Sequence, residues 1–138
     1  MPSILREAEL LKPVSGNLRK QGYRKQQDEV QFFEYRMDIY GYASKTDRTT
    51  AVELKLHRWM RAFEQALIYK LCADYVYLAL PAKTIARVEM PLLVTHGLGL
   101  ICVENGHKCD VVLEAVQSTI VLPHYRDFYI QLMQKGTG

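Results

Sequence analysis

Apolar residues recur at helical spacing in four parts of the chain. Near the N-terminus the spacing predicts a helix over residues 4–20, which Pro13 interrupts or kinks. Residues 58–71 carry the clearest pattern, because large apolar side chains fall on one face and no Gly or Pro breaks it. Weaker patterns predict two further helices, over residues 82–95 and 124–135.

Runs of β-forming residues lie between these helices. Residues 23–42 contain two strand-like stretches, separated by a turn near residues 34–36. The polar run at residues 44–48 predicts a second turn, and residues 50–56 beyond it alternate as a strand does. We therefore expect a hairpin that returns as a third strand.

Further strands are predicted in the second half of the chain. The short apolar run 74–80 is typical of a buried strand that follows a helix, which implies a parallel crossover from the third strand. Residues 99–104 and 110–115 lie on either side of a predicted turn at Asn105-Gly106. Residues 1–138 are therefore expected to form a single α/β domain, a mixed central β-sheet flanked by helices.

Composition agrees with a packed, soluble domain. Of the 138 residues, 49% are apolar and 24% are charged, close to the globular average. No apolar run reaches the ~18 residues of a transmembrane helix, and acidic residues stand where a signal peptide needs an apolar stretch. We expect a cytoplasmic protein with no membrane partner. Cys72, Cys102 and Cys109 form no C-x-x-C pair and are expected to be reduced.

The third predicted strand presents an acid and a base together. Side chains alternate across a sheet, so Glu53 and Lys55 share one face while Leu54 takes the other. Asp38 stands 15 residues before Glu53, in the strand expected to pair with this one. Mg²⁺ typically uses one or two carboxylates and several waters, so this pair matches an incomplete Mg²⁺ site. An exposed strand face with a weak ion pair is the alternative.

This pattern, Asp38 followed by Glu53-Leu54-Lys55, resembles the PD-(D/E)XK nuclease superfamily, whose restriction-endonuclease-like fold includes Holliday junction resolvases and RecB-type nucleases. Gln65 and Tyr69 are similar to the Q-x-x-x-Y motif beside the active site of RecB-type members. The edge of a buried helix face is the alternative for that pair. One departure is Met37, which stands where the motif has proline.

The resemblance implies a function and a set of site residues. Asp38 and Glu53 are implied to bind Mg²⁺ or Mn²⁺, with the backbone carbonyl of Leu54 as a third ligand, and Lys55 is implied to be the catalytic lysine. The implied activity is hydrolysis of phosphodiester bonds in DNA. The alternative is a catalytically silent DNA-binding or protein-interaction module on the same fold.

Some members, resolvases especially, add an acid from the first helix to the metal site. Glu9 is the preferred candidate here and Glu7 the other, because Pro13 leaves the helical phase open. Stabilisation of the helix start by an acidic side chain is the alternative for both. Glu29, on the first strand, is a further candidate.

Positive charge is concentrated in one third of the chain. Residues 19–61 hold ten Lys/Arg against six Asp/Glu, a surplus of four, within a net charge of +3. A solvated basic face is one explanation. The other is contact with DNA phosphates by the basic residues that flank the site, namely Arg24, Lys25, Arg58 and Arg61, with Arg19 and Lys20 as further candidates. With no separate specificity domain in 138 residues, a homodimer, an added partner or structure-selective recognition is expected.

Overall fold

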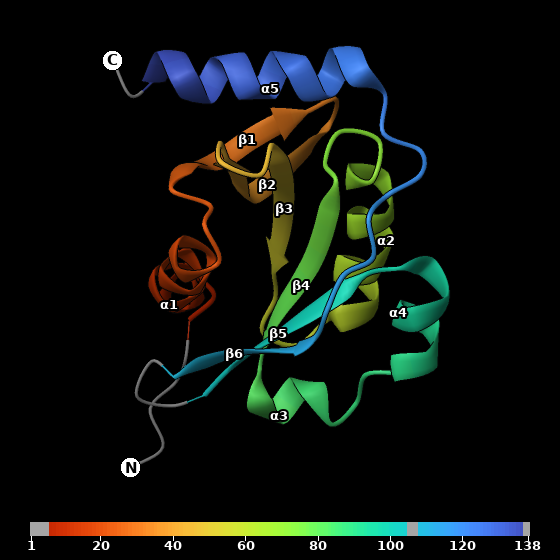
Figure 1. Ribbon diagram of the computed structural model, residues 1–138. Coiled ribbons are helices and arrows are strands. Elements are labelled where there is room, and N and C mark those ends of the chain that lie inside the picture. The colour runs from red at the N-terminus through yellow and green to blue at the C-terminus, as the bar shows by residue number, and fades with distance from the viewer. Residues whose placement is uncertain (1–5, 105–107, 137–138) are drawn as a thin grey trace.

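The computed structural model describes residues 6–104 and 108–136 of the chain, and these form one six-stranded sheet with helices on both faces (Figure 1). The predicted turn at Asn105-Gly106 lies outside the described residues. The elements, in chain order, are α1 (Ala8–Lys20), β1 (Lys25–Phe32), β2 (Tyr35–Ala43), β3 (Arg48–Leu54), α2 (Trp59–Tyr69), β4 (Tyr75–Pro81), α3 (Ala82–Ile85), α4 (Met90–His96), β5 (Gly99–Val103), β6 (Cys109–Leu113) and α5 (Pro123–Gly136).

The strands follow chain order across the sheet, and their directions are mixed. Antiparallel pairing joins β1 to β2, β2 to β3 and β5 to β6. The two central pairs, β3 with β4 and β4 with β5, are parallel. The predicted hairpin into a third strand and the crossover through the helix after it are therefore confirmed. Together they confirm the α/β class with a mixed central sheet.

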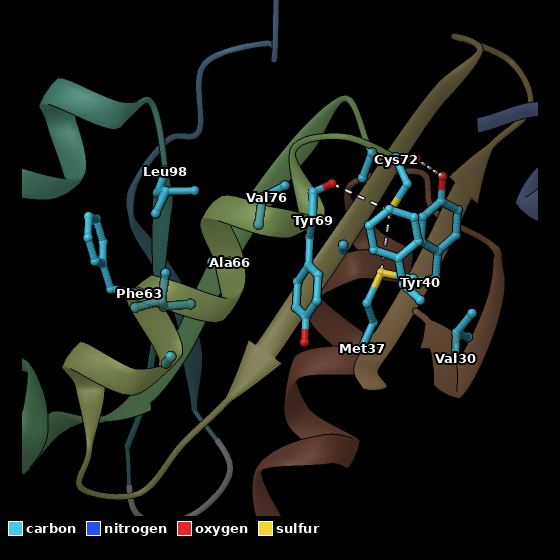
Figure 2. Packing of buried hydrophobic residues seen from close by; sticks show 14 of the residues in the cluster. Val30, Met37, Tyr40, Phe63, Ala66, Tyr69, Cys72, Val76 and Leu98 are labelled. Atoms are coloured by element: carbon cyan, nitrogen blue, oxygen red, sulfur yellow. Dashed lines mark hydrogen bonds between the residues drawn. The ribbon is translucent and has the colours of Figure 1, made fainter. Parts of the chain in front are cut away.

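Each face of the sheet has its own buried apolar cluster. On the α1 side, Leu10, Val14 and Leu18 are all fully buried, and burial of such a side chain contributes about 2 kcal/mol. The α2 side is built from the apolar face of α2 and the side chains that α5 lays over β1 and β2. Figure 2 shows Tyr69 and Met37 together in this second cluster, which also holds the buried Cys72.

Two predicted elements differ from the structure for local reasons. The expected helix over residues 82–95 is two short helices, because Pro91 has no N–H for a continuous helix and is tolerated only in a first turn. The turn expected near residues 34–36 begins earlier, at Phe33, whose φ of 55° is left-handed. None of the described helices is long and apolar enough to cross a membrane.

The last helix is tied to the sheet by one buried ion pair. The Arg126 Nε donates to both carboxylate oxygens of Asp74, at 3.0 and 3.1 Å, and Asp74 is only 7% exposed. Asp74 Oδ2 also accepts the backbone N–H of Thr49, at 2.9 Å. This network fixes α5 against the starts of β3 and β4, away from the predicted acids.

Candidate active site

Asp38 lies where β2 and β3 stop pairing. The last paired residues toward this end are Ile39 and Val52, and beyond them the Leu54 N–H donates to the Asp38 carboxylate, Oδ2, at 2.7 Å. The side-chain oxygen of Asp38 thus accepts the N–H that a backbone carbonyl of β2 would accept in a regular sheet. The consequence is that the Asp38 carboxylate is held against the end of β3 and is only half-buried.

The alternation of side chains along β2 is broken next to this position. Ile39 packs in the cluster on the α1 side and Met37 in the cluster on the α2 side, although residues two apart in a regular strand share a face. On β1, Glu29 lies between the register pairs Asp28–Ile39 and Val30–Met37 and has a φ of 52°. A left-handed backbone at a non-glycine residue is uncommon and is found where the chain is constrained by its surroundings.

Glu53 is the buried member of the pair. It is 3% exposed, and Ala51 two residues earlier packs in the cluster on the α2 side, so the Glu53 side chain faces α2. Tyr69 reaches it from the last turn of α2. The Tyr69 hydroxyl donates to Glu53 Oε1 at 2.8 Å, with the carbonyl oxygen of Arg36 as a longer second acceptor at 3.2 Å.

Burial makes both carboxyl groups harder to ionise. Burial, then the neighbouring Asp38, raise the pKa of Glu53 from 4.5 to about 8, although the Tyr69 hydroxyl and the Lys55 charge pull it down. Burial also raises the pKa of Asp38, against the lowering effect of the Leu54 N–H. Both groups therefore keep their protons to a higher pH than free carboxyl groups do.

Lys55 follows β3 directly and completes the group. Its backbone N–H donates to the Ala79 carbonyl of β4 at 3.2 Å, which continues the parallel ladder by one bond, and its side chain is half-buried. Its positive charge lowers the pKa of both Asp38 and Glu53. Two carboxylates and a lysine therefore converge as the sequence pattern predicted.

The first-helix acid whose charge acts on the pair is Glu7, and not the preferred Glu9. Glu7 lies three residues before the buried Leu10, on the side of α1 that faces the sheet, and its charge raises the pKa of both Asp38 and Glu53. Glu9 is exposed. The sequence did not decide between the two acids, because Pro13 left the helical phase open. In the structure Pro13 lies inside α1 without ending it, so Glu7 lies on the same side of the helix as Leu10 and the later buried residues.

The other candidate acid points into solvent. The Glu29 side chain is 72% exposed and pairs with Arg36 at 3.7 Å.

In residues 6–104 and 108–136 no three His, Cys, Asp or Glu side chains lie close enough together to hold a metal ion. The acidic oxygen donors of the candidate site are therefore the carboxyl groups of Asp38 and Glu53. Gln65 lies one helical turn before Tyr69. The buried Oε1 of Gln65 has no hydrogen-bond partner within the described residues.

The predicted DNA-contacting residues fall at two separate places. Arg58 and Arg61 are exposed at the start of α2, shortly after Lys55. Lys25 instead pairs with Tyr42, four residues along β2 from Asp38, which is ~14 Å at ~3.4 Å per residue. Arg24 precedes Lys25, so this pair, which flanks the site in the sequence, lies near the other end of β2. Arg19 and Lys20 lie at the far end of α1, ~18 Å along the helix from Glu7.

The fold has a known counterpart. It matches a protein of unknown function from Silicibacter pomeroyi with a TM-score of 0.74 and 20% sequence identity, over 99% of this chain and 88% of that chain. At this identity the likeness shows the fold alone. No protein-family model and no curated protein matches the sequence.

Proposed function

We propose that this chain is a metal-dependent nuclease of the PD-(D/E)XK type, which hydrolyses phosphodiester bonds in DNA. The observation that carries the proposal is the convergence of Asp38, Glu53 and Lys55 where β2 and β3 separate. Leu54 ties Asp38 to the end of β3, and Lys55 acts electrostatically on both carboxyl groups. Metal-dependent hydrolysis of a phosphodiester uses carboxylates that hold the metal ion and a positive charge that stabilises the transition state. Both must lie at one place.

Asp38 and Glu53 are the residues that would hold Mg²⁺ or Mn²⁺, and their chemistry fits such an ion. Both are hard oxygen donors, and a divalent cation would offset the cost of ionising these buried carboxyl groups. The Leu54 carbonyl remains the predicted third ligand. When bound, the ion polarises a phosphoryl oxygen and makes water a better nucleophile.

The remaining side chains have supporting roles in this proposal. The Lys55 ammonium holds the attacking water and offsets the negative charge that builds up on the phosphate in the transition state. Tyr69 acts through Glu53, because its hydroxyl fixes the orientation of that carboxylate. Gln65 lies one turn from Tyr69, and we propose that it helps to position the groups on the Tyr69 side of the site.

A cleavage panel tests the proposal. The purified chain is incubated with single-stranded, duplex, flapped and branched DNA in Mg²⁺ or Mn²⁺, with EDTA as the control. We expect at least one form to be nicked or cut, and EDTA to stop the reaction. Intact DNA across the panel, with binding retained, would instead support the non-cutting DNA-binding module.

A further inference from the structure

Basic residues without an ion-pair partner among the described residues gather on one flank of the proposed site. Residues 54–63, which join β3 to α2, carry three Lys/Arg and no Asp or Glu. Residues 80–88, which include α3, carry two more and again no acid. The five side chains, none of which makes an ion pair with a described acidic residue, are Lys55, Arg58, Arg61, Lys83 and Arg87.

The two segments are neighbours in space. The Thr84 hydroxyl of α3 donates to the Leu56 carbonyl, in the loop that follows Lys55. Lys83 precedes Thr84, and the Arg87 N–H donates to the Thr84 carbonyl at 3.0 Å, so both basic residues lie within one turn of that contact. Both are exposed. Figure 1 shows α3 and the start of α2 at the same end of the sheet.

The opposite flank is acidic. Residues 28–38, in β1 and β2, carry four Asp/Glu and one Arg. Asp28 and Glu34 are exposed without an ion-pair partner among the described residues, and the single Arg36 pairs with Glu29. A polyanion that approaches Asp38 and Glu53 is therefore attracted from the α3 side and repelled from the β1 side.

We propose that the surface formed by Lys55, Arg58, Arg61, Lys83 and Arg87 binds the phosphate backbone of DNA, with α3 as an essential part of it. This inference rests on the proposed function, because it names the surface that brings DNA to the acid pair. It assigns Lys83 and Arg87, which are 28 and 32 residues after Lys55 in the sequence, to the same contact. It also removes Arg24 and Lys25 from that contact.

Binding measured in EDTA tests this surface independently of cleavage. Fluorescence anisotropy with labelled single-stranded and duplex DNA is compared for the wild type, Lys83→Ala with Arg87→Ala, and the control Arg24→Ala with Lys25→Ala. Each double variant removes one Lys and one Arg, so the change in net charge is the same. Thermal melting of each variant checks folding, which should be unchanged because Arg24, Lys83 and Arg87 are exposed and Lys25 is only half-buried.

We expect the Lys83/Arg87 variant to lose affinity on the order of 10-fold at low salt, and its slope of log affinity against log salt to become shallower by about 1.4 to 1.8. The Arg24/Lys25 variant should bind as the wild type does. Equal losses in both variants, an unchanged Lys83/Arg87 variant, or a wild type that binds no DNA would overturn the proposed surface. Surface-dependent binding without cleavage in Mn²⁺ would refute the nuclease proposal and leave the surface standing.

Discussion

The Tyr69 hydroxyl donates a hydrogen bond of 2.8 Å to the carboxylate of Glu53, although the two residues lie on different elements and 16 positions apart. Because this bond favours the ionised carboxylate, Tyr69→Phe should raise the pKa of Glu53 further. Mn²⁺ affinity at pH 7.5 should then fall severalfold, and the unfolding free energy should drop by about 1–2 kcal/mol. Calorimetric Mn²⁺ titration and urea unfolding measure the two effects.

Tyr77→Phe is the matched control for this experiment. Its hydroxyl also donates to a glutamate, Glu114 Oε2 at 3.0 Å, but that contact lies on the other side of the sheet. A loss of Mn²⁺ affinity equal to that of Tyr69→Phe would show that the Tyr69–Glu53 bond has no specific part in ion binding.

The raised pKa of Glu53 also predicts how stability depends on pH. Between the ordinary value of 4.5 and the folded value of about 8, the folded protein binds more protons than the unfolded chain. Stability in EDTA should therefore be greatest below about pH 4.5 as far as this group is concerned, and should fall as pH rises toward 8. One pKa unit corresponds to about 1.4 kcal/mol, so the loss is a few kcal/mol.

Glu53→Gln removes this titration and should flatten the decline in stability between pH 5 and pH 8. Urea unfolding of both proteins in EDTA across this range is the measurement. If the wild type and Glu53→Gln show parallel pH profiles, Glu53 is not held in its protonated form by the fold.

Local patterns were sufficient to predict most of the fold and the strands on which Asp38 and Glu53 lie. The spacing in residues 58–71 and the apolar run at residues 74–80 predicted the crossover, because a strand, a helix and a buried strand in succession pack in few ways. Alternation along β3 placed Glu53 opposite the face taken by Leu54, which the two apolar clusters confirm.

The parts that could not be predicted depend on distant contacts. The electrostatic effect of Glu7 on the acid pair depends on how α1 is rotated against the sheet. The place of Lys83 near the loop after Lys55 depends on the hydrogen bond from Thr84 to Leu56. Arg24 and Lys25 are near Asp38 in sequence, but antiparallel pairing carries them to the other end of β2. Proximity along the chain was a poor guide wherever a strand lay between two residues.

The buried Arg126–Asp74 pair should matter far more to stability than the surface pair Arg36–Glu29. Arg126→Ala leaves the Asp74 carboxylate buried without its cation and should cost about 3–5 kcal/mol. Arg36→Ala breaks a pair whose side chains are 62% and 72% exposed and should cost less than about 1 kcal/mol. Denaturant unfolding of both variants checks the contrast, and similar losses would contradict the structural role given to Asp74.

Substitutions of the acid and of the lysine in the proposed site should have different effects on metal affinity and cleavage rate. Asp38→Asn keeps an oxygen that can accept the Leu54 N–H but loses the charge, so metal affinity and cleavage should fall together. Lys55→Met removes only the ammonium, so ion binding should persist or tighten while turnover falls by ~10²-fold or more. Calorimetric titration beside single-turnover cleavage separates the two, and a Lys55→Met protein that cuts at the parental rate would end the catalytic assignment.

Single-turnover cleavage by wild type and Asp38→Asn, prepared in the same way and used at equal concentration in Mn²⁺, tests the central claim most directly. A contaminating nuclease would be present in both preparations, whereas the proposed site is complete in only one. The account predicts cleavage of at least one DNA form by the wild type, its loss in EDTA, and a rate at least ~10²-fold lower for Asp38→Asn. Equal rates in the two preparations, or no cleavage of any DNA form by the wild type, would contradict it.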